Sequence, residues 1–398
     1  MRTSELFDRT ELRAARPLLA DEADPLEALA RAAWSSLAEP GDAVAATLID
    51  SVGAPAALAH VIRSSSAADI LAEIEGSADE LTTLAAGLER WRPRVDRALL
   101  RRRVEIARRL DARLLIPGSE GWPESLDDLG PHAPLVLWIR GDPSALSARH
   151  RVAVVGARAA TGYGEHVAAE LAAGAADRGA LVVSGGAFGI DAVAHRAALG
   201  TGGRTVAFLA GGADRLYPTA HSDLLHRIIA TPGSAVVTEV PPGTTPTRWR
   251  FLQRNRLIAA STAVTVVVEA GARSGSLNTA GHAAALGRPL GAVPGPVTSA
   301  SSAGCHRLLR EYAATCVTST SDVLELLGLA ETPVADSEPL GPASRVMDAL
   351  RGRGPHDSES VARHSGCSVA DTLAVLGALL ADGHVHRTDD GGWEAVRR

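Results

Sequence analysis

The chain of 398 residues contains no lysine, so all of its 40 basic residues are arginine. This absence excludes a nucleotide-binding loop built on the Walker A lysine, an enzyme that forms a Schiff base through lysine, and a kinase that needs a phosphate-binding lysine. A GC-rich genome would explain the arginine bias together with the abundance of alanine. The bias by itself therefore assigns no function.

Cysteine is scarce, and long apolar runs are missing. The three cysteines, Cys305, Cys316 and Cys367, form no CxxC pair and are too few for a disulfide framework, so we expect no metal site. No stretch approaches the roughly 20 apolar residues of a membrane span. Charges occupy the N-terminal MRTSELFDRTELRAARP, where a signal peptide would be apolar. We therefore expect a cytoplasmic protein that contacts no membrane.

Positive charge is unevenly distributed along the chain. The net charge is −6, yet residues 151–330 contain 15 arginines against 11 acidic residues. A basic middle on an acidic chain indicates a localised anion site rather than a surface that is positive throughout.

Hydrophobic periodicity divides the chain into parts of different type. Apolar residues at three- and four-residue spacing as far as Arg113 predict a helical N-terminal domain, residues 1–115. Strand-like and helical segments then alternate, which predicts an α/β fold with a Rossmann-like, doubly wound parallel sheet in residues 116–330. A linker containing proline and acidic residues, 331–342, precedes three predicted helices and a hairpin in residues 343–398. That order is typical of a winged-helix domain.

The predicted strands of the sheet are short and rich in valine. They are Val152–Val155, Ala180–Ser184, Thr205–Leu209, Ser234–Thr238, Val264–Glu269 and Leu290–Val293. The helices predicted between and around them are His166–Arg178, Ala192–Leu199, Ser222–Ala230 and Thr279–Leu286. In such sheets ligands bind beyond the carboxyl ends of the strands, so the residues that follow each strand are site candidates.

Small and basic residues lie at the ends of the first three strands. They are Gly156 and Arg158, Ser184 and Gly185, and Gly211 and Gly212. Glycine lets a ligand approach the backbone closely, and free N–H groups at helix starts bind phosphate. The dinucleotide motif GxGxxG does not occur in a strand-to-helix context, so we expect no dinucleotide and no other cofactor.

Arginine and aromatic residues are concentrated between residues 248 and 256, with four arginines, Trp249 and Phe251. Guanidinium groups beside flat apolar rings are the elements of single-strand recognition. Arg254, Asn255 and Arg256 are therefore candidate DNA ligands. The two aromatic residues could instead anchor the core, and for them we favour that alternative.

Small polar residues follow the strand that ends at Glu269. Ser274, Gly275, Ser276 and Thr279 lead into a predicted helix. They could cap the helix, or they could join free N–H groups in holding a phosphate. Capping needs only one such residue, so the excess favours ligand contact.

No nucleophile with an adjacent base is recognisable. Asp191 and His195 lie one helical turn apart, and we expect the first to start a helix and the second to pack in the core. Asp214, Glu239 and Glu269, at strand ends, are the remaining candidates for catalysis. We expect a binding protein rather than an enzyme.

In order and spacing, these motifs resemble the bacterial DNA-processing protein A family, also called the DprA/Smf family, over about residues 150–325. The matching segments are Val155-Gly156-Ala157-Arg158, Ser184-Gly185, Gly189-Ile190-Asp191, Gly212 through Asp214 to Tyr217-Pro218, Arg254-Asn255-Arg256, Ser274-Gly275-Ser276-Leu277, Thr279-Ala280, Val293-Pro294-Gly295 and Gly304-Cys305.

The resemblance implies an extended Rossmann-like domain that binds single-stranded DNA. It also implies an N-terminal domain similar to a sterile alpha motif, a winged-helix C-terminus, a homodimer, and loading of the recombinase RecA in natural transformation and recombination. Such a protein protects incoming DNA and could also meet single-strand-binding protein. The resemblance further implies that Arg158 and Arg204 line the DNA pocket, with Arg254 and Arg256 as further members.

The chain departs from the family pattern at three positions. Phe188 stands where the family usually has arginine, Gly186 where it has leucine, and Leu252 where it has proline. Loss of an arginine would lower phosphate affinity unless Phe188 stacks in its place.

Two other functions compete with this interpretation. A Rossmann-like phosphoribohydrolase would carry a PGGxGTxxE signature, but here Gly211-Gly212 leads to Ala213-Asp214, and Val240-Pro241-Pro242-Gly243 lacks the glutamate. A transcriptional regulator would read duplex DNA through the winged helix, but its seven arginines are spread among acidic residues. We expect that domain to bind a protein instead.

An apolar stretch near the end of the sheet domain could supply a dimer or RecA surface. It runs from Leu308 to Leu327 and includes Tyr312 and Val323. Burial in the core of the monomer explains it equally well.

Overall fold

The computed structural model describes residues 6–19, 23–74, 77–329, 341–351 and 354–396. The described residues up to 329 form one compact unit, and those from 341 onward form a second.

A nine-stranded sheet lies at the centre of the first unit, in the order β1-β2-β6-β5-β4-β3-β7-β8-β9. The strands are β1 (Arg113–Leu115), β2 (Leu137–Gly141), β3 (Arg151–Val155), β4 (Leu181–Ser184), β5 (Thr205–Phe208), β6 (Ala235–Thr238), β7 (Val264–Val267), β8 (Leu290–Ala292) and β9 (Thr315–Cys316). Strands β3 to β9 pair in parallel, whereas β1 and β2 are added antiparallel at one edge. The prediction of a doubly wound parallel sheet is confirmed, although β1, β2 and β9 were not predicted.

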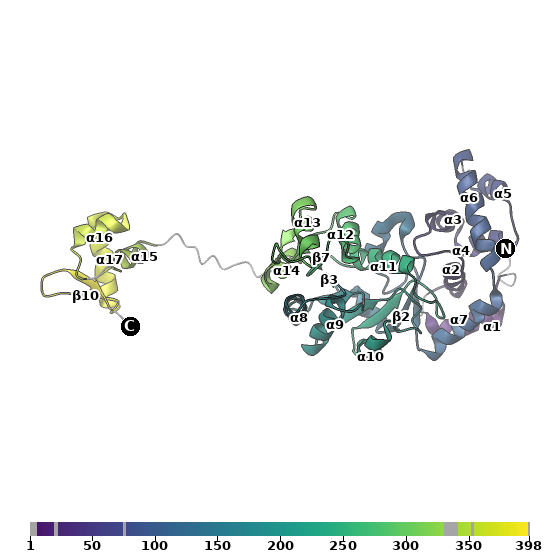
Figure 1. Cartoon of the computed structure of the whole chain (residues 1–398), viewed down its shortest axis with the longest axis horizontal. Helices are drawn as coiled ribbons and strands as arrows, with labels where there is room; N and C mark the ends of the chain where they lie inside the picture. The colour runs from purple at the N-terminus through teal and green to yellow at the C-terminus, as the bar shows by residue number, and fades with distance from the viewer. Residues whose placement is uncertain (1–5, 20–22, 75–76, 330–340, 352–353, 397–398) are drawn as a thin grey trace. The chain divides into compact units, whose positions relative to one another are not determined.

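Helices cover both faces of the sheet, which is why its central strands are almost entirely apolar. Val152 and Val154 of β3 share a core with α8 and α9, while Ala153 and Val155 share another core with α11 and α12. Figure 1 shows these two pairs of helices on opposite sides of the sheet. The helices of this part are α8 (Gly162–Asp177), α9 (Ile190–Gly200), α10 (Ser222–Ala230), α11 (Arg248–Ala260), α12 (Ser276–Ala285), α13 (Ala303–Glu311) and α14 (Thr320–Leu326).

The direction in which the chain moves across the sheet changes between β3 and β7. From β3 the chain proceeds outward through β4, β5 and β6, and it then returns to the other side of β3 for β7, β8 and β9. The connections that follow β3 and β7 therefore diverge, which opens a crevice at the carboxyl ends of these two strands.

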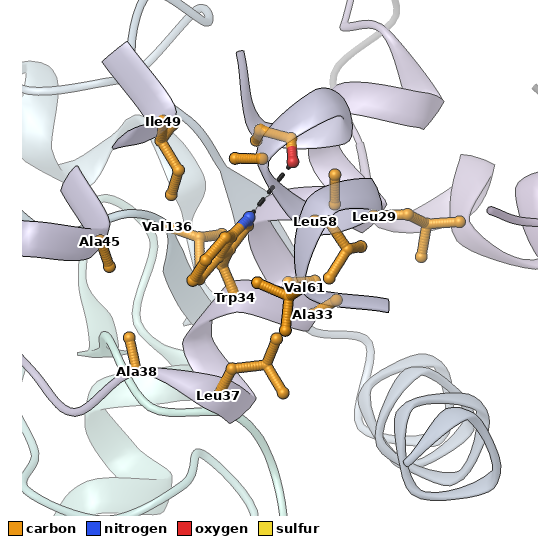
Figure 2. Close-up of a cluster of buried hydrophobic side chains, with 14 of the residues drawn as sticks. Leu29, Ala33, Trp34, Leu37, Ala38, Ala45, Ile49, Leu58, Val61 and Val136 are labelled. Carbon is orange, nitrogen blue, oxygen red and sulfur yellow. Dashed lines mark hydrogen bonds between the residues drawn. The ribbon is translucent and has the colours of Figure 1, made fainter. Parts of the chain in front are cut away.

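In the described part of the chain, seven α-helices precede the sheet and pack around buried tryptophans. Trp34 donates from Nε1 to the carbonyl of Ala54 at 3.2 Å (Figure 2). The ring of Trp34 also meets that of Trp91 edge to face at 5.0 Å. Val136 and Trp138, beside and within β2, belong to the same core. The helices are α1 (Arg9–Ala15), α2 (Pro25–Leu37), α3 (Ala43–Val52), α4 (Ala54–Ile62), α5 (Ala67–Glu73), α6 (Ala78–Trp91) and α7 (Arg97–Arg109).

This shared core joins the helical region to the sheet, and the sheet begins earlier than predicted. Strand β1 starts at Arg113, inside the range 1–115 that we assigned to the helical domain. Short 3-10 helices connect the elements: η2 (Arg16–Leu18), η3 (Arg92–Arg94), η4 (Glu124–His132), η5 (Pro143–Ser147) and η6 (Thr219–His221). The likeness to a sterile alpha motif stays a prediction.

The apolar stretch between Leu308 and Leu327 packs mostly inside the first unit. Leu308, Val323, Leu324 and Leu327 are buried in its core, whereas Tyr312 is exposed. Of the two explanations for this stretch, burial in the monomer is the one that the packing supports.

The second unit contains three helices followed by a hairpin, as the sequence predicts. They are α15 (Pro342–Ala349), α16 (Ser358–Ser365), α17 (Val369–Ala381), β10 (Val385–Arg387) and β11 (Trp393–Ala395). Its core includes Val346, Leu376 and Trp393. The winged-helix assignment stays a prediction, and most of the predicted linker, 331–342, lies outside the described residues.

Within the described residues, no single helix is long and apolar enough to span a bilayer. Two sharply bent helix pairs, α3 with α4 and α16 with α17, meet the length and composition criteria only when taken together.

Candidate nucleic-acid interface

A cavity of about 610 Å³ lies in the crevice between the carboxyl ends of β3 and β7. Its walls come from the loop 156–159 after β3, from α11, and from the segment 271–276 that leads into α12. This is the position at which doubly wound sheets bind their ligands.

Helix α11 determines which residues of the arginine-rich segment reach the cavity. It begins after Thr247, whose Oγ1 accepts the N–H of Arg250 at 3.3 Å. Because neighbours on one helical face are three or four residues apart, Phe251, Arg254 and Ile258 line the cavity together.

Two exposed guanidinium groups stand at the mouth of the cavity. Arg158 lies with its guanidinium carbon 5.0 Å from the centre of the Phe251 ring, a cation–π contact. Arg273 also lines the cavity and is exposed. Sequence reasoning did not single out Arg273, although it follows β7 as Arg158 follows β3.

The two aromatic residues of α11 do not anchor the core, contrary to our expectation. Phe251 lines the cavity, and Trp249 is 56% exposed. The ring of Tyr217 lies 5.9 Å from that of Phe251, and Tyr217 is 48% exposed. Phe188, at the position of the family arginine, is exposed and contacts the ring of His221 at 4.7 Å. Of these four aromatic residues, Phe251 is the one that lines the cavity, beside Arg158.

Arg254 forms the buried floor of the cavity. Its Nη1 donates to the carbonyls of Gly185 and Phe208, each at 2.6 Å. Burial lowers the pKa of Arg254 to about 10, while the nearby Asp191 acts in the opposite direction. The guanidinium thus stays charged near neutral pH, and it places fixed positive charge under any ligand.

Residue 185 is glycine because the side chain of Arg254 leaves no room for a Cβ, and not because a ligand approaches it. A Cβ at residue 185 would collide with the Arg254 guanidinium. The N–H of Gly185 also donates to Asp191 at 3.2 Å, as does the N–H of Ala187 at 3.3 Å. Burial raises the pKa of the Asp191 carboxyl. Asp191 therefore serves the local backbone near the start of α9, as we expected.

The polar segment before α12, residues 271–276, forms another wall of the cavity. Asn255 donates from Nδ2 to the carbonyl of Gly275 at 3.3 Å and to Asn278 Oδ1 at 3.2 Å. The hydroxyls of Ser274 and Ser276 are hydrogen-bonded to each other at 2.8 Å, and both residues line the cavity with Thr279. Gly275 is the N-cap of α12 and no side chain makes a capping hydrogen bond there, so capping does not account for this cluster.

Eight of the fourteen residues predicted for the site therefore meet at this cavity. They are Gly156, Arg158, Arg254, Asn255, Ser274, Gly275, Ser276 and Thr279. The other six lie elsewhere, and each has a structural reason. Ser184 is fully buried and donates to the carbonyl of Val154 at 2.7 Å.

Gly211 and Gly212 lie in a turn that packs against the segment 241–246. The N–H of Gly212 donates to the carbonyl of Thr244 at 2.9 Å, and a Cβ on Gly212 would come within 2.7 Å of the carbonyl oxygen of Pro241. These glycines let two backbone segments approach each other closely. They do not line the cavity between β3 and β7, which is called the first cavity below.

The expectation that Arg256 belongs to the DNA pocket needs correction. Its two terminal nitrogens each donate to a carboxylate oxygen of Glu239 at 2.6 Å, and its Nε donates to the carbonyl of His132 at 2.8 Å. Arg256 is 2% exposed. The guanidinium is thus committed to a buried ion pair that links α11 with β6 and η4.

Arg204 also lies apart from the cavity. It directly precedes β5, so it sits at the amino end of a parallel strand, whereas the cavity lies beyond the carboxyl ends. Its Nη2 donates to the carbonyl of Gly179 at 3.1 Å, and its side chain packs on Gly233. The resemblance placed Arg204 in the pocket, and the topology of the sheet separates it from the other members.

The acidic residues considered for catalysis are engaged in structural contacts. Asp214 accepts the N–H of Gly243 at 2.7 Å, Glu239 pairs with Arg256, and Glu269 accepts both the N–H and the hydroxyl of Thr161 at 2.9 Å. Buried His195 is hydrogen-bonded to Thr205 at 2.7 Å. Among the described residues, no group of three or more His, Cys, Asp or Glu side chains could hold a metal ion.

Comparison with known families identifies the family of this chain. The family model described as DNA recombination-mediator protein A matches residues 113–328, more than half of the chain. The chain belongs to the DNA recombination-mediator protein A family. The match covers the whole sheet and the cavity, but not the N-terminal helices or the second unit.

Relatives of this family extend the match over nearly the whole chain. The putative DNA processing protein DprA of Mycobacterium tuberculosis is 45% identical over 388 residues, covering 92% of this chain and 94% of the relative. Protein Smf of Escherichia coli is 38% identical over 214 residues, covering 54% and 56%. The crystal structure of DNA processing protein A from Streptococcus pneumoniae has a TM-score of 0.59 at 30% identity, covering 74% of this chain and 95% of that one.

Proposed function

We propose that this chain is a cytoplasmic, single-stranded DNA-binding recombination mediator rather than an enzyme. The observation that carries the proposal is the pairing of Arg158 with Phe251 at the mouth of the first cavity. Guanidinium groups neutralise phosphates, and aromatic faces stack on bases of any sequence. The description of the family as a recombination mediator, and the names of its DNA-processing relatives, agree with this role.

The site favours single strands over duplex DNA on chemical grounds. A ring such as Phe251 can stack on a base only where that base is not already stacked in a helix. Phosphates would be held by Arg158, Arg273 and the amino end of α12. The buried charge of Arg254 supports them from below.

A mobility-shift comparison tests this function. Labelled single strands of several sequences and the matching duplexes would be titrated at a series of salt concentrations. We expect tight binding of single strands with little sequence preference, and a log–log salt slope of about −0.7 for each neutralised phosphate. Equal affinity for duplex and single strand would overturn the proposal.

The enzyme alternative, a phosphoribohydrolase-like protein, has little support. Asp214, Glu239 and Glu269 are each held by structural contacts and do not line the first cavity. Asp191, the carboxylate that does line it, accepts the N–H groups of Gly185 and Ala187. Incubation with nucleoside monophosphates should release no base. Turnover that is lost in Glu269→Gln would favour the enzyme instead.

We further propose a homodimer that loads RecA onto DNA during natural transformation or other recombination. Two DNA cavities in one dimer would hold one strand with greater avidity than a single cavity. In this proposal the second unit is a winged helix that serves as a protein-binding module, since its arginines are interspersed with acidic residues.

The loading role has its own test. Sedimentation at micromolar concentration would establish the oligomer, and RecA ATP turnover would be followed on strands coated with single-strand-binding protein. We expect a dimer and faster RecA turnover. A monomer without any acceleration would remove the loading role but leave the DNA-binding role intact.

A further inference from the structure

A second cavity, of about 490 Å³, lies at the loop that follows β5. It is lined by Arg140 of β2, by Arg215 and Tyr217 of the loop, and by Ser222 and His226 of α10. This cavity plays no part in the site described above, and its lining combines basic and polar residues with Leu110, Leu216 and Pro246.

Arg140 has unused hydrogen-bonding capacity in this lining. Its Nη1 donates to the carbonyl of Ala213 at 3.0 Å, but its buried Nε has no partner among the described residues. Buried polar groups are nearly always hydrogen-bonded, and an unpaired donor on a charged group is costly. Because this incompletely paired guanidinium belongs to a residue that lines the cavity, its charge would favour an anion there.

The other charges of the cavity also favour an anion. Arg215 is half-exposed, and the hydroxyls of Thr219 and Ser222 also line the cavity. Asp214 opposes an anion, but its Oδ1 accepts the N–H of Gly243 at 2.7 Å and its Oδ2 lies 3.8 Å from Arg215. Two guanidinium groups therefore stand against one carboxylate that is already partly satisfied.

Tyr217 connects the two cavities. It lines the second cavity, while its ring lies 5.9 Å from Phe251, which lines the first. Gly212 holds this loop in place, because its carbonyl accepts the N–H of Arg215 at 2.8 Å and its own N–H donates to Thr244. A strand leaving the first cavity across Phe251 would meet Tyr217 next.

We propose that the second cavity is a second subsite for the same single strand. Arg140 and Arg215 bind a phosphodiester of that strand, and Tyr217 stacks on a base between the two cavities. The inference rests on the proposed single-strand binding and deepens it, since it gives the strand a direction from β3 and β7 across the sheet toward β2.

A length series of oligothymidylates tests the subsite. Anisotropy titrations would use strands from about 4 to about 16 nucleotides, the range of site sizes known for single-strand-binding folds. For the parent protein we expect affinity to rise in two stages as the strand becomes long enough to reach the second cavity. Arg215→Gln and Tyr217→Leu should each remove the second stage, lowering affinity for the long strands on the order of tenfold.

Arg215→Gln should leave the shortest strands unaffected, because Arg215 lines the second cavity and not the first. Arg158→Ala should weaken every length, and Arg310→Ala, which removes an exposed charge on α13, should weaken none. If both second-cavity variants bind long strands like the parent, or weaken short and long strands equally, the second subsite is wrong. If the parent binds no strand of any length, the proposed function itself fails.

Discussion

The mouth of the first cavity and the buried layer around α11 are both rich in arginine, but the arginines of the two regions make different contacts. At the mouth, Arg158 and Arg273 are exposed, and Arg158 lies over the ring of Phe251. In the buried layer, Arg254 and Arg256 are 5% and 2% exposed, and protein carbonyls or carboxylates accept their hydrogen bonds. An exposed guanidinium can exchange water for phosphate, whereas a paired, buried one would have to break the fold first.

The largest effect should come from the buried layer. Arg256→Ala leaves the Glu239 carboxylate buried and unpaired, which should destabilise the protein by about 3–5 kcal/mol. Urea denaturation followed by circular dichroism would measure the loss. Affinity for single strands, measured on folded protein, should stay within about twofold of the parent.

A paired replacement is the control for that variant. Arg256→Met combined with Glu239→Leu removes both charges and keeps apolar volume, so it should recover most of the stability. If Arg256→Ala instead folds normally and loses DNA affinity, Arg256 binds DNA, and the distinction between DNA-binding arginines at the mouth and structural arginines in the buried layer is wrong.

The next effect is a pH dependence that also belongs to the buried layer. Burial, with lesser effects from the charges of Arg254 and His221, lowers the pKa of His195 to about 3. The unfolded chain therefore binds a proton below about pH 6.5 that the folded chain excludes. Stability should fall as the pH drops from about 6.5 toward 3, at about 1.4 kcal/mol per pH unit from this group.

His195→Gln isolates that contribution. The raised pKa of Asp191 acts in the opposite sense, but it is present in both proteins. The stability of the parent relative to His195→Gln should therefore shrink between pH 6 and pH 4, as urea midpoints would show. If the stabilities of the two proteins change in parallel between pH 6 and pH 4, His195 is protonated in the folded protein.

The sequence predicts the sheet well because its central strands are short, buried on both faces and rich in valine. Helix α11 was harder, since every residue from Arg254 to Ala260 is buried and no polar face marks the helical period. Strand β2 was missed because it is a short antiparallel addition with arginine and glycine at its end. Hydrophobic periodicity identifies an element clearly when one of its faces is buried. It identifies a helix that is buried all round, or a strand at the edge of a sheet, poorly.

The same limit of local sequence patterns explains why some site residues were predicted wrongly. Arg254 and Arg256 are two residues apart and look alike in sequence, yet the partner of Arg256 is Glu239, on another part of the sheet. Only the tertiary structure shows that pairing. Arg204, by contrast, could have been excluded from the sequence, because it precedes its predicted strand and candidate ligands follow theirs.

At the mouth, Arg158→Ala should lower single-strand affinity on the order of tenfold, since hydrogen bonds to charged groups contribute about 1.5–3 kcal/mol. The log–log salt slope should become shallower by about 0.7. Stability should change by less than about 0.5 kcal/mol, because the side chain is exposed. Anisotropy across a salt series measures both binding quantities, with Arg310→Ala as the surface control. A loss of stability without a change in slope would place Arg158 in the buried layer.

The smallest effect should come from Arg204→Ala, which tests the position of the site against the family resemblance. Arg204 is exposed like Arg158, but it lies at the amino end of β5, beside the carbonyl of Gly179 and across the sheet from the cavity. Phosphates bound beyond the carboxyl ends of the strands would be too far away to contact it. We therefore expect affinity within about twofold of the parent and an unchanged salt slope in the same anisotropy series. If Arg204→Ala instead matches Arg158→Ala in both quantities, the strand must also pass along the amino edge, and exposure alone, rather than position at the cavity, would decide which arginines bind DNA.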